Sequence, residues 1–277
     1  MSDLPRLVAT DLDGTLCGAD GLVSDRTRHV LEALDARDVP VVFVTGRPLR
    51  WAREVFEHVG SHGLAVVSNG ALLWDITRDR AVRTRGITAA DARDWCEALR
   101  AAVPGTAFGV ESLAGLDVEP AFVERFPLPE GARRAPLADL LTDEPASAPL
   151  KLLARHEDLG PQEFWDLAER ATGGSLTITW SSSTTLLEVS AAGVTKATTL
   201  ADLCADLGVA PEEVIAFGDM PNDLPMLRWA GRSYAMEGAH ESVLAVADHV
   251  APDHAEDGVA RVLAGVFDLP PDTLEGC

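Results

Sequence analysis

The sequence is poor in positive charge. Its 277 residues contain 23 Lys and Arg against 44 Asp and Glu, which gives a formal net charge of −21. Nucleic acids and anionic membranes are bound by basic surfaces, so this balance excludes both as expected partners. It does not exclude a phosphorylated substrate, because local cations and a metal ion decide whether a phosphate group is held.

Long apolar runs and paired cysteines are also lacking. The first six residues have neither the basic start nor the apolar core of a signal peptide. The longest strand-like run, residues 39–44, is interrupted by Pro40 and is much too short to cross a bilayer. Neither a CxxC pair nor a zinc-site spacing occurs among the four cysteines, which are Cys17, Cys96, Cys204 and Cys277. We therefore expect reduced thiols and a cytoplasmic protein.

The first 80 residues alternate between predicted strands and predicted helices. Apolar runs at 7–10, 39–44 and 64–68 predict buried strands. Ser24 and Pro48 lie between these runs and are typical of helix starts. An Asn-Gly pair after the third run predicts a hairpin. This order predicts an α/β fold with a doubly wound, Rossmann-like parallel sheet.

The pattern changes at about residue 81. Between residues 81 and 187 the predicted elements are shorter, and 115–149 is rich in Pro and Gly with little periodicity. This texture predicts an inserted α+β domain with an antiparallel sheet. The expected domains are therefore 1–80 with 188–277, and 81–187. Within the first of these, residues 264–277 are interpreted as a tail with little to pack.

Two carboxylates follow the first predicted strand. Asp11 and Asp13 are spaced i, i+2, so they are expected on the same side of the chain. Gly14 permits a sharp turn after them, and the Thr15 hydroxyl can cap it. Ligands bind at the carboxyl ends of strands in open α/β sheets, and like charges this close need a cation or a proton between them. Taken alone, the motif favours an acidic turn after an edge strand.

Two further stretches come where they can converge on the same edge of the sheet. Thr45 and Gly46 end the second strand and offer a hydroxyl and backbone N–H groups to phosphate oxygens. Lys196 stands in the first turn of a predicted helix, where it opposes the helix dipole and so favours an anionic neighbour. Their alternatives are an ordinary strand-to-helix turn and a solvated surface lysine.

The stretch from Gly218 to Asp223 is the most informative after the opening one. It places Asp219, Asn222 and Asp223 at the end of a strand, where their oxygens suit Mg²⁺. A third carboxylate beside Asp11 and Asp13 would not be tolerated without a cation. The alternative is an Asn-Asp pair that caps a helix.

These stretches resemble, in order, the four motifs of the haloacid dehalogenase-like (HAD) phosphatases. The insertion between the second and third motifs is similar in position and size to the cap of the Cof-type branch, the type IIB cap. The resemblance implies a HAD core with an inserted α+β cap domain. The matching residues are Asp11-Leu12-Asp13-Gly14-Thr15, Thr45-Gly46-Arg47, Lys196 and Gly218-Asp219-x-x-Asn222-Asp223.

The resemblance implies a role for each carboxylate. Asp11 would be the nucleophile that forms an aspartyl-phosphate. Asp13 would be the general acid that protonates the leaving alcohol and then the base that activates water. Mg²⁺ would be held by Asp11, by the backbone carbonyl of Asp13 and by Asp219. Asp223 would support the metal site from behind.

The remaining motif residues are implied to bind phosphate. They are Thr45, Gly46, Lys196 and Asn222. The expected protein is a Mg²⁺-dependent phosphomonoesterase that acts, as a monomer or homodimer, on a small metabolite such as a sugar phosphate or a phosphorylated cofactor precursor. A phosphomutase or phosphotransferase using the same aspartyl-phosphate is an alternative. An inactive module that binds a phosphorylated metabolite is a more distant one, because no motif residue is missing.

Overall fold

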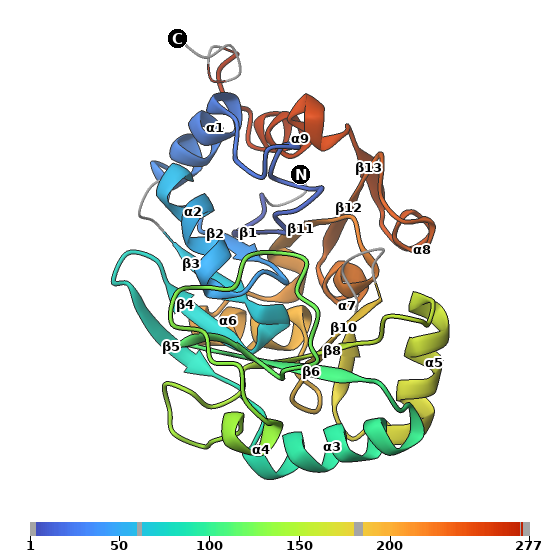
Figure 1. The fold of residues 1–277 in the computed structure, drawn as a ribbon. Helices are drawn as coiled ribbons and strands as arrows, with labels where there is room; N and C mark the ends of the chain where they lie inside the picture. The colour runs from blue at the N-terminus through green and yellow to red at the C-terminus, as the bar shows by residue number, and fades with distance from the viewer. Residues whose placement is uncertain (1–3, 60–62, 180–184, 272, 274–277) are drawn as a thin grey trace. The chain divides into compact units, whose positions relative to one another are not determined.

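A sheet of eight strands organises the first part of the chain. In the computed structural model, which describes residues 4–59, 63–179, 185–271 and 273, the strand order is β13-β12-β11-β1-β2-β3-β4-β5 (Figure 1). Neighbours from β13 to β3 are parallel, and β4 pairs antiparallel with β3. The strands are β1 (Leu7–Thr10), β2 (Val41–Val44), β3 (Leu64–Val67), β4 (Leu72–Asp75), β5 (Arg80–Thr84), β11 (Val214–Gly218), β12 (Arg232–Met236) and β13 (His249–Ala251).

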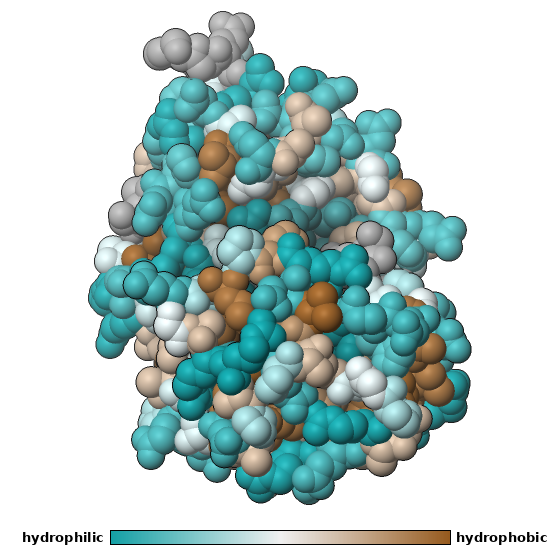
Figure 2. All heavy atoms as spheres, in the orientation of Figure 1, coloured by the Kyte–Doolittle hydropathy of each residue, from teal (hydrophilic) through white to brown (hydrophobic). Residues whose placement is uncertain are grey.

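The chain divides into two units. Unit 1 is Met1–Arg83 with Lys196–Cys277 and holds this sheet, and unit 2 is Thr84–Thr195. Hydrophilic residues predominate on the face drawn in Figure 2. This agrees with the many charged residues of the chain, 44 acidic and 23 basic. Within the described ranges, no helix has the length and apolar character that a membrane crossing requires.

The helices of unit 1 cover a sheet whose central strands are buried. Side chains of β1 are wholly buried, as expected for a parallel strand covered on both faces. Helix α1 contacts α9 and α6 contacts α7. The helices are α1 (Asp25–Asp35), α2 (Leu49–Val59), α6 (Lys196–Leu207), α7 (Leu224–Trp229), α8 (Glu241–Leu244) and α9 (Gly258–Val266), with short 3₁₀ turns η1 (Ser68–Gly70), η2 (Pro211–Glu213), η3 (Pro221–Asp223) and η4 (His254–Glu256).

Local sequence explains where these helices begin and which face they bury. The Ser24 side chain accepts a hydrogen bond from the backbone N–H of Thr27, so the predicted cap of α1 is confirmed. In α2 the buried positions recur at helical spacing, and Phe56 stacks on Phe43 of β2 with ring centroids 5.9 Å apart.

A second, antiparallel sheet forms the centre of unit 2. Its order is β7-β6-β8-β10-β9, and α3 packs against α5 beside it. Thr88 caps α3 by accepting from the N–H of Asp91, as the sequence predicts. The elements are α3 (Ala89–Ala102), β6 (Ala107–Ser112), β7 (Gly115–Val118), α4 (Leu137–Leu140), β8 (Lys151–Arg155), α5 (Pro161–Thr172), β9 (Thr177–Thr179) and β10 (Leu186–Ser190).

The predicted fold class is confirmed, and three details differ. The strand β10 pairs with β8 and β9, so the chain returns to the parallel sheet after Thr195 and not at residue 188. Residues 115–149, which lack a clear pattern, contain β7 and α4. In the expected tail, α9 continues to Val266, and Phe267 and Leu269 are 4% and 8% exposed, because these apolar side chains find a place in the core. Whether unit 2 is a cap domain stays a prediction.

Candidate active site

Three neighbouring parallel strands end at the same edge of the sheet in unit 1. Asp11 follows β1, Thr45 follows β2 and Asp219 follows β11. Strand β1 lies between the other two, with Thr10 opposite Phe217 on one side. The chain order runs away from β1 in both directions, which makes this edge the topological switch point where open α/β sheets bind ligands.

Lys196 links two of the predicted carboxylates. It is the first residue of α6 and is only 1% exposed. Its Nζ donates to Oδ1 of Asp11 at 2.8 Å and to Oδ1 of Asp223 at 2.7 Å. Burial opposes the charge of Lys196, but the two carboxylates raise its pKa above the ordinary value. The alternative of a solvated surface lysine is therefore excluded.

Three carboxylates lie together around this ammonium. Oxygen atoms of Asp11, Asp219 and Asp223 all lie within 4.8 Å of one another. Burial, and then the neighbouring Asp223, raise the pKa of Asp219 to about 6. Burial also raises the pKa of Asp11 against the opposing effect of Lys196. The cluster therefore has more negative charge than the protein itself balances, and its hard oxygen donors suit a divalent cation.

The turn after β1 is built to approach Asp219. The Thr15 hydroxyl donates to Oδ1 of Asp219 at 3.0 Å. Gly14 has a φ of +72°, and a Cβ atom there would collide with the Asp219 carboxylate. Glycine is thus required at this position both for the backbone conformation and for the close approach.

The Asp13 carboxylate lies apart from this cluster in the described part of the chain. Its Oδ2 accepts from Nε of Arg47 at 2.8 Å, and its Oδ1 accepts from an Nη of the same guanidinium. The Asp13 side chain is 60% exposed, while that of Arg47 is 15% exposed. The sequence suggested no contact for Arg47, because the pairing depends on how two turns after different strands face each other.

A turn with unusual backbone angles supports the predicted phosphate loop. Ser68 and Asn69 have φ values of 51° and 55°, and Gly70 has 105°. The N–H of Ser68 donates to the carbonyl of Arg47 at 2.9 Å, and that of Asn69 donates to the carbonyl of Thr45 at 3.1 Å. Left-handed angles cost about 1–2 kcal/mol for a residue with a side chain, so tertiary contacts must hold this turn.

Asn69 also contacts the stretch after β11. Its Oδ1 accepts from Nδ2 of Asn222 at 3.2 Å, and the same oxygen lies 3.0 Å from where a Cβ on Gly46 would be. The Oδ1 atom of Asn222 is buried without a hydrogen-bond partner among the described residues. Asn69 is thus a site residue to which the sequence analysis assigned no role beyond a hairpin turn. The tolerance of asparagine for left-handed angles is the signal that could have pointed to it.

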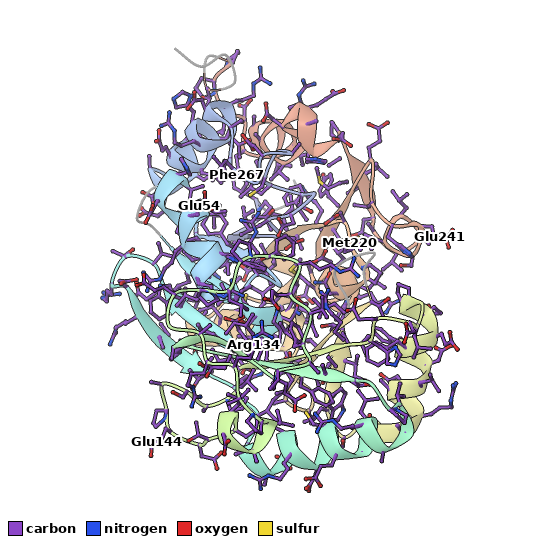
Figure 3. The ribbon with its side chains drawn as sticks, viewed as in Figure 1. Glu54, Arg134, Glu144, Met220, Glu241 and Phe267 are labelled. Atoms are coloured by element: carbon purple, nitrogen blue, oxygen red, sulfur yellow. The ribbon has the colours of Figure 1, made fainter. Side chains whose placement is uncertain are left out.

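The second acidic turn positions two of the predicted residues. Met220, labelled in Figure 3, precedes η3, which carries Asn222 and Asp223. Oδ2 of Asp223 accepts from the N–H groups of Asp219 and Met220, both at 3.1 Å. Asp223 is fully buried, so it orients the turn as well as binding Lys196.

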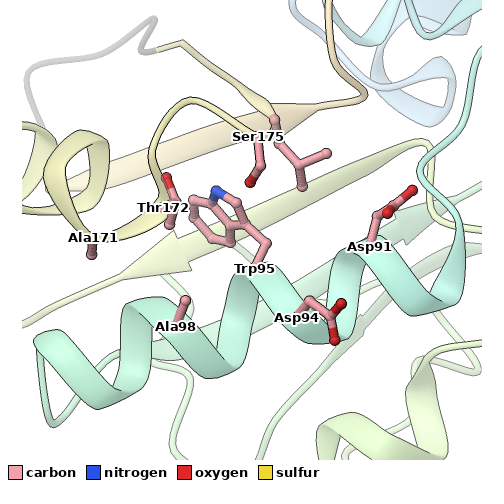
Figure 4. A pocket seen from close by; sticks show the side chains of 8 residues that line it. Asp91, Asp94, Trp95, Ala98, Ala171, Thr172 and Ser175 are labelled. Atoms are coloured by element: carbon pink, nitrogen blue, oxygen red, sulfur yellow. The ribbon is translucent and has the colours of Figure 1, made fainter.

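Two other features carry none of this chemistry. Burial raises the pKa of Cys17 to about 12, so its thiol stays protonated and behaves as a small apolar side chain. A pocket in unit 2 lies between α3 and the end of α5 and contains none of the predicted site residues (Figure 4). Trp95, Thr172 and Ser175 are among its lining residues.

Similarity to known proteins identifies the family to which this chain belongs. Residues 8–263 match the family model of the haloacid dehalogenase-like hydrolases. The chain belongs to this family. A Bacillus subtilis relative named 5-amino-6-(5-phospho-D-ribitylamino)uracil phosphatase is 30% identical over 260 residues, which cover 93% of this chain and 94% of the relative. A phosphoglycolate phosphatase of Methanopyrus kandleri is 28% identical over 257 residues, which cover 93% and 95%.

Solved structures share the fold. A Streptococcus mutans protein superimposes with a TM-score of 0.83 at 22% identity, covering 95% of this chain and 99% of that one. A sugar phosphatase of HAD subclass IIB superimposes with a TM-score of 0.77 at 21% identity, covering 96% and 100%. The predicted membership of the HAD hydrolases and the predicted fold class are confirmed.

Proposed function

We propose that this HAD hydrolase is a Mg²⁺-dependent phosphomonoesterase that hydrolyses a small phosphorylated metabolite, with Asp11 as the nucleophile. The observation that supports this most is the buried charge at the sheet edge. The carboxylates of Asp11, Asp219 and Asp223 lie within 4.8 Å of one another, and among the described residues Lys196 pairs with two of them, Asp11 and Asp223. The named activities of the relatives, both phosphatases of small phosphate esters, support the same reaction class.

The chain's own residues supply the nucleophile and its support. Asp11 attacks phosphorus with a carboxylate oxygen, and the bond from phosphorus to the leaving alcohol breaks. Lys196 donates to Oδ1 of Asp11, which fixes the orientation of the carboxylate and stabilises its charged form. A water molecule then attacks the phosphorus atom of the aspartyl-phosphate and releases inorganic phosphate.

Asp13 moves the proton in this scheme. It protonates the leaving oxygen and later takes a proton from the attacking water. Because the Asp13 carboxylate is paired with Arg47, it must first turn away from that guanidinium. Its largely exposed side chain has room to do so.

The phosphate oxygens are bound by the loop after β2 and by η3. The Thr45 hydroxyl accepts from the N–H of Arg47 at 3.0 Å, which leaves its own proton free to donate to a phosphate oxygen. Gly46 offers a backbone N–H beside it, and Asn222 offers an amide. We further propose that unit 2 is the cap domain, because it is inserted between the second and third motifs.

The donor set fits Mg²⁺. Asp11 and Asp219, with the backbone carbonyl of Asp13, would hold the ion, and it would offset the negative charge of the carboxylates and of the transferring phosphoryl group. Asp223 is already bound by Lys196 and by two backbone N–H groups, so we assign it a supporting role.

Release of inorganic phosphate tests the proposal. The panel contains the phosphorylated ribitylaminouracil, phosphoglycolate and hexose phosphates, each assayed with MgCl₂ and with EDTA. We expect the unaltered protein to release phosphate only with Mg²⁺, and Asp11→Asn to release none. Asp248→Asn is the matched control, because Asp248 binds Ser233 outside the acidic cluster and its loss leaves the site intact.

Two results would contradict the proposal. Turnover by Asp11→Asn that equals the unaltered protein would exclude Asp11 as the nucleophile. Transfer of phosphate to an added alcohol, with no release to water from any ester, would favour the phosphotransferase alternative. Circular dichroism of each variant separates a lost reaction from a lost fold.

A further inference from the structure

The antiparallel sheet of unit 2 has two unlike faces. Along β8, Leu152 and Ala154 belong to the apolar cluster that includes α3 and α5. Leu153 belongs to a separate cluster. Side chains alternate along a strand, so Lys151 and Arg155 lie on the same face as Leu153, away from the helices.

The two cations on this face have different surroundings. Lys151 is 2% exposed, and its Nζ donates to Oε1 of Glu188 at 2.8 Å. Arg155 is 6% exposed, and its guanidinium lies over the ring of Phe122 at 5.6 Å. Its Nε is buried without an acceptor, and the described part of the chain gives the Arg155 side chain neither a hydrogen bond nor an ion pair. Its two Nη atoms are not among the buried unpartnered atoms, so they reach solvent and are open to an anion.

A second guanidinium adds to the positive charge. Arg125 is half exposed and forms a long ion pair with Glu157, at 3.7 Å. Burial, followed by the charge of Arg125, lowers the pKa of Arg155, and the effect of Glu157 is in the opposite direction but smaller. The guanidiniums of Arg125 and Arg155 are therefore both near the carboxylate of Glu157, and Arg125 is the one that pairs with it.

We propose that Arg155, with Arg125 beside it, is a binding site in unit 2 for an anionic group, either a phosphate or a carboxylate. A planar guanidinium binds such groups with two parallel hydrogen bonds, and the ring of Phe122 covers one face of this one, 5.6 Å away. Lys151 is not part of the site, because Glu188 already occupies its ammonium. The site does not depend on the proposed phosphatase activity.

Nuclear magnetic resonance of arginine side chains tests the site directly. The probe is sulfate, titrated into the uniformly ¹⁵N-labelled full chain against chloride at equal ionic strength. Arg155→Lys identifies the Nε–H resonance of Arg155 by its disappearance. We expect this resonance to shift and saturate with sulfate. A resonance that does not move in sulfate, relative to chloride, would overturn the proposal.

Stability in the absence of multivalent anions gives a second, independent readout. Arg155→Met keeps the length of the side chain and removes only an unpaired charge, so the urea midpoint should stay or rise. The matched control is Arg100→Met in the same unit, since Arg100 pairs with the buried Glu119 at 2.6 Å and its loss leaves that carboxylate with no cation, only the backbone N–H of Phe108. Its midpoint should fall. An equal fall in Arg155→Met would mean that the chain already balances Arg155, contrary to the proposal.

Kinetics then distinguish the two sources of the anion, and only this arm rests on the proposed function. Phosphoglycolate carries a carboxylate on its leaving group, and ethyl phosphate is the matched ester without one. If the anion belongs to the substrate, Arg155→Met raises KM for phosphoglycolate about 10- to 100-fold, the equivalent of a charged hydrogen bond, and leaves ethyl phosphate unchanged. If the anion is a separate ligand, both KM values stay while the sulfate response is lost. Inactivity toward both esters would count against the proposed function alone, because the sulfate titration needs no turnover.

Discussion

The two units of this protein bury charge of opposite sign. At the sheet edge of unit 1, the carboxylates of Asp11, Asp219 and Asp223 outnumber the one ammonium between them. On the sheet face of unit 2 that points away from α3 and α5, the guanidinium of Arg155 has no carboxylate partner among the described residues. Both arrangements oppose folding unless something is added, and the sign of the excess indicates what that is: a metal ion for the first and an anion for the second.

Removing the ammonium of Lys196 should disturb the charge balance in unit 1 and cause the largest loss of stability among these predictions. Lys196→Met leaves two buried carboxylates without their cation, so the free energy of unfolding should fall by about 3–5 kcal/mol, and phosphate release should cease. Urea unfolding without metal measures the change. Adding Asp223→Asn should recover part of the stability, because one uncompensated charge is removed. A single variant as stable as the unaltered protein would show that the cluster is not charged as the structure implies.

Magnesium should stabilise the protein through the carboxylates of unit 1 and not through the guanidinium of unit 2. At a free concentration 100 times its Kd, a ligand of the folded state adds about 2.7 kcal/mol to the free energy of unfolding. Asp219→Asn should lose most of this response, while Arg155→Met should keep it. Urea curves at increasing MgCl₂, with NaCl at equal ionic strength, measure it. A response that Asp219→Asn retains in full would place the ion elsewhere.

Lys151 offers a buried ion pair in unit 2 for comparison with Lys196. Lys151→Met leaves one buried carboxylate, that of Glu188, where Lys196→Met leaves two, so the free energy of unfolding should fall by about 2 kcal/mol. The double variant with Glu188→Gln should recover more than half of the loss, as a double-mutant cycle would show. If the two losses simply added, the pair would not be coupled.

Substitutions of Asn69 test whether a neutral residue helps to hold the loops around the acidic site. Asn69→Gly loses the amide contact with Asn222 but tolerates a φ of 55°. Asn69→Ala loses the amide and must also adopt that angle, so it should be about 1 kcal/mol less stable than the glycine variant. Both should bind the competitive inhibitor vanadate more weakly. Equal stability of the two variants would mean that the turn relaxes to ordinary angles.

An exposed carboxylate should give the smallest effect and so a baseline for the buried ones. Hydrogen bonds from the side chain and backbone of Ser233 lower the pKa of Asp248 from its usual 3.8. Its contribution is therefore present above pH 3.8 and lost as pH falls below that value. Asp248→Asn should cost less than about 1 kcal/mol at neutral pH because solvent screens the site, and the difference should shrink below pH 4. Urea midpoints at both pH values measure it, and a pH-independent difference would contradict the assignment.

Local patterns were enough to predict the architecture and the residues at the sheet edge. Apolar runs that stop at Asp11, Thr45 and Asp219 identify parallel strands, and the carboxyl ends of such strands must meet at one edge. The place of Lys196 in a first helical turn indicated an anionic neighbour but not its burial, because lysines are usually exposed.

Contacts between loops could not be predicted in the same way. The pairing of Asp13 with Arg47 depends on the angle between two turns, which no periodicity encodes. The surroundings of Arg155, whose side chain has no partner among the described residues, depend on the register of β8 and on the loop that brings Phe122 over it. That loop lies in the patternless stretch 115–149. Sequence patterns therefore predict elements and their ends, while the balance of buried charge requires the tertiary structure.

The position of β1 in the middle of its sheet also has a consequence for biosynthesis. One neighbour, β2, leaves the ribosome soon after β1, but the other, β11, ends just before Asp219, which is 204 residues after Thr15. At roughly 5–20 residues per second, synthesis of that interval takes about 10–40 s, and all of unit 2 is made within it. Throughout this time one edge of β1, a strand that is fully buried in the folded protein, lacks the neighbour it will have, and an unpaired strand edge is prone to wrong pairing until β11 emerges.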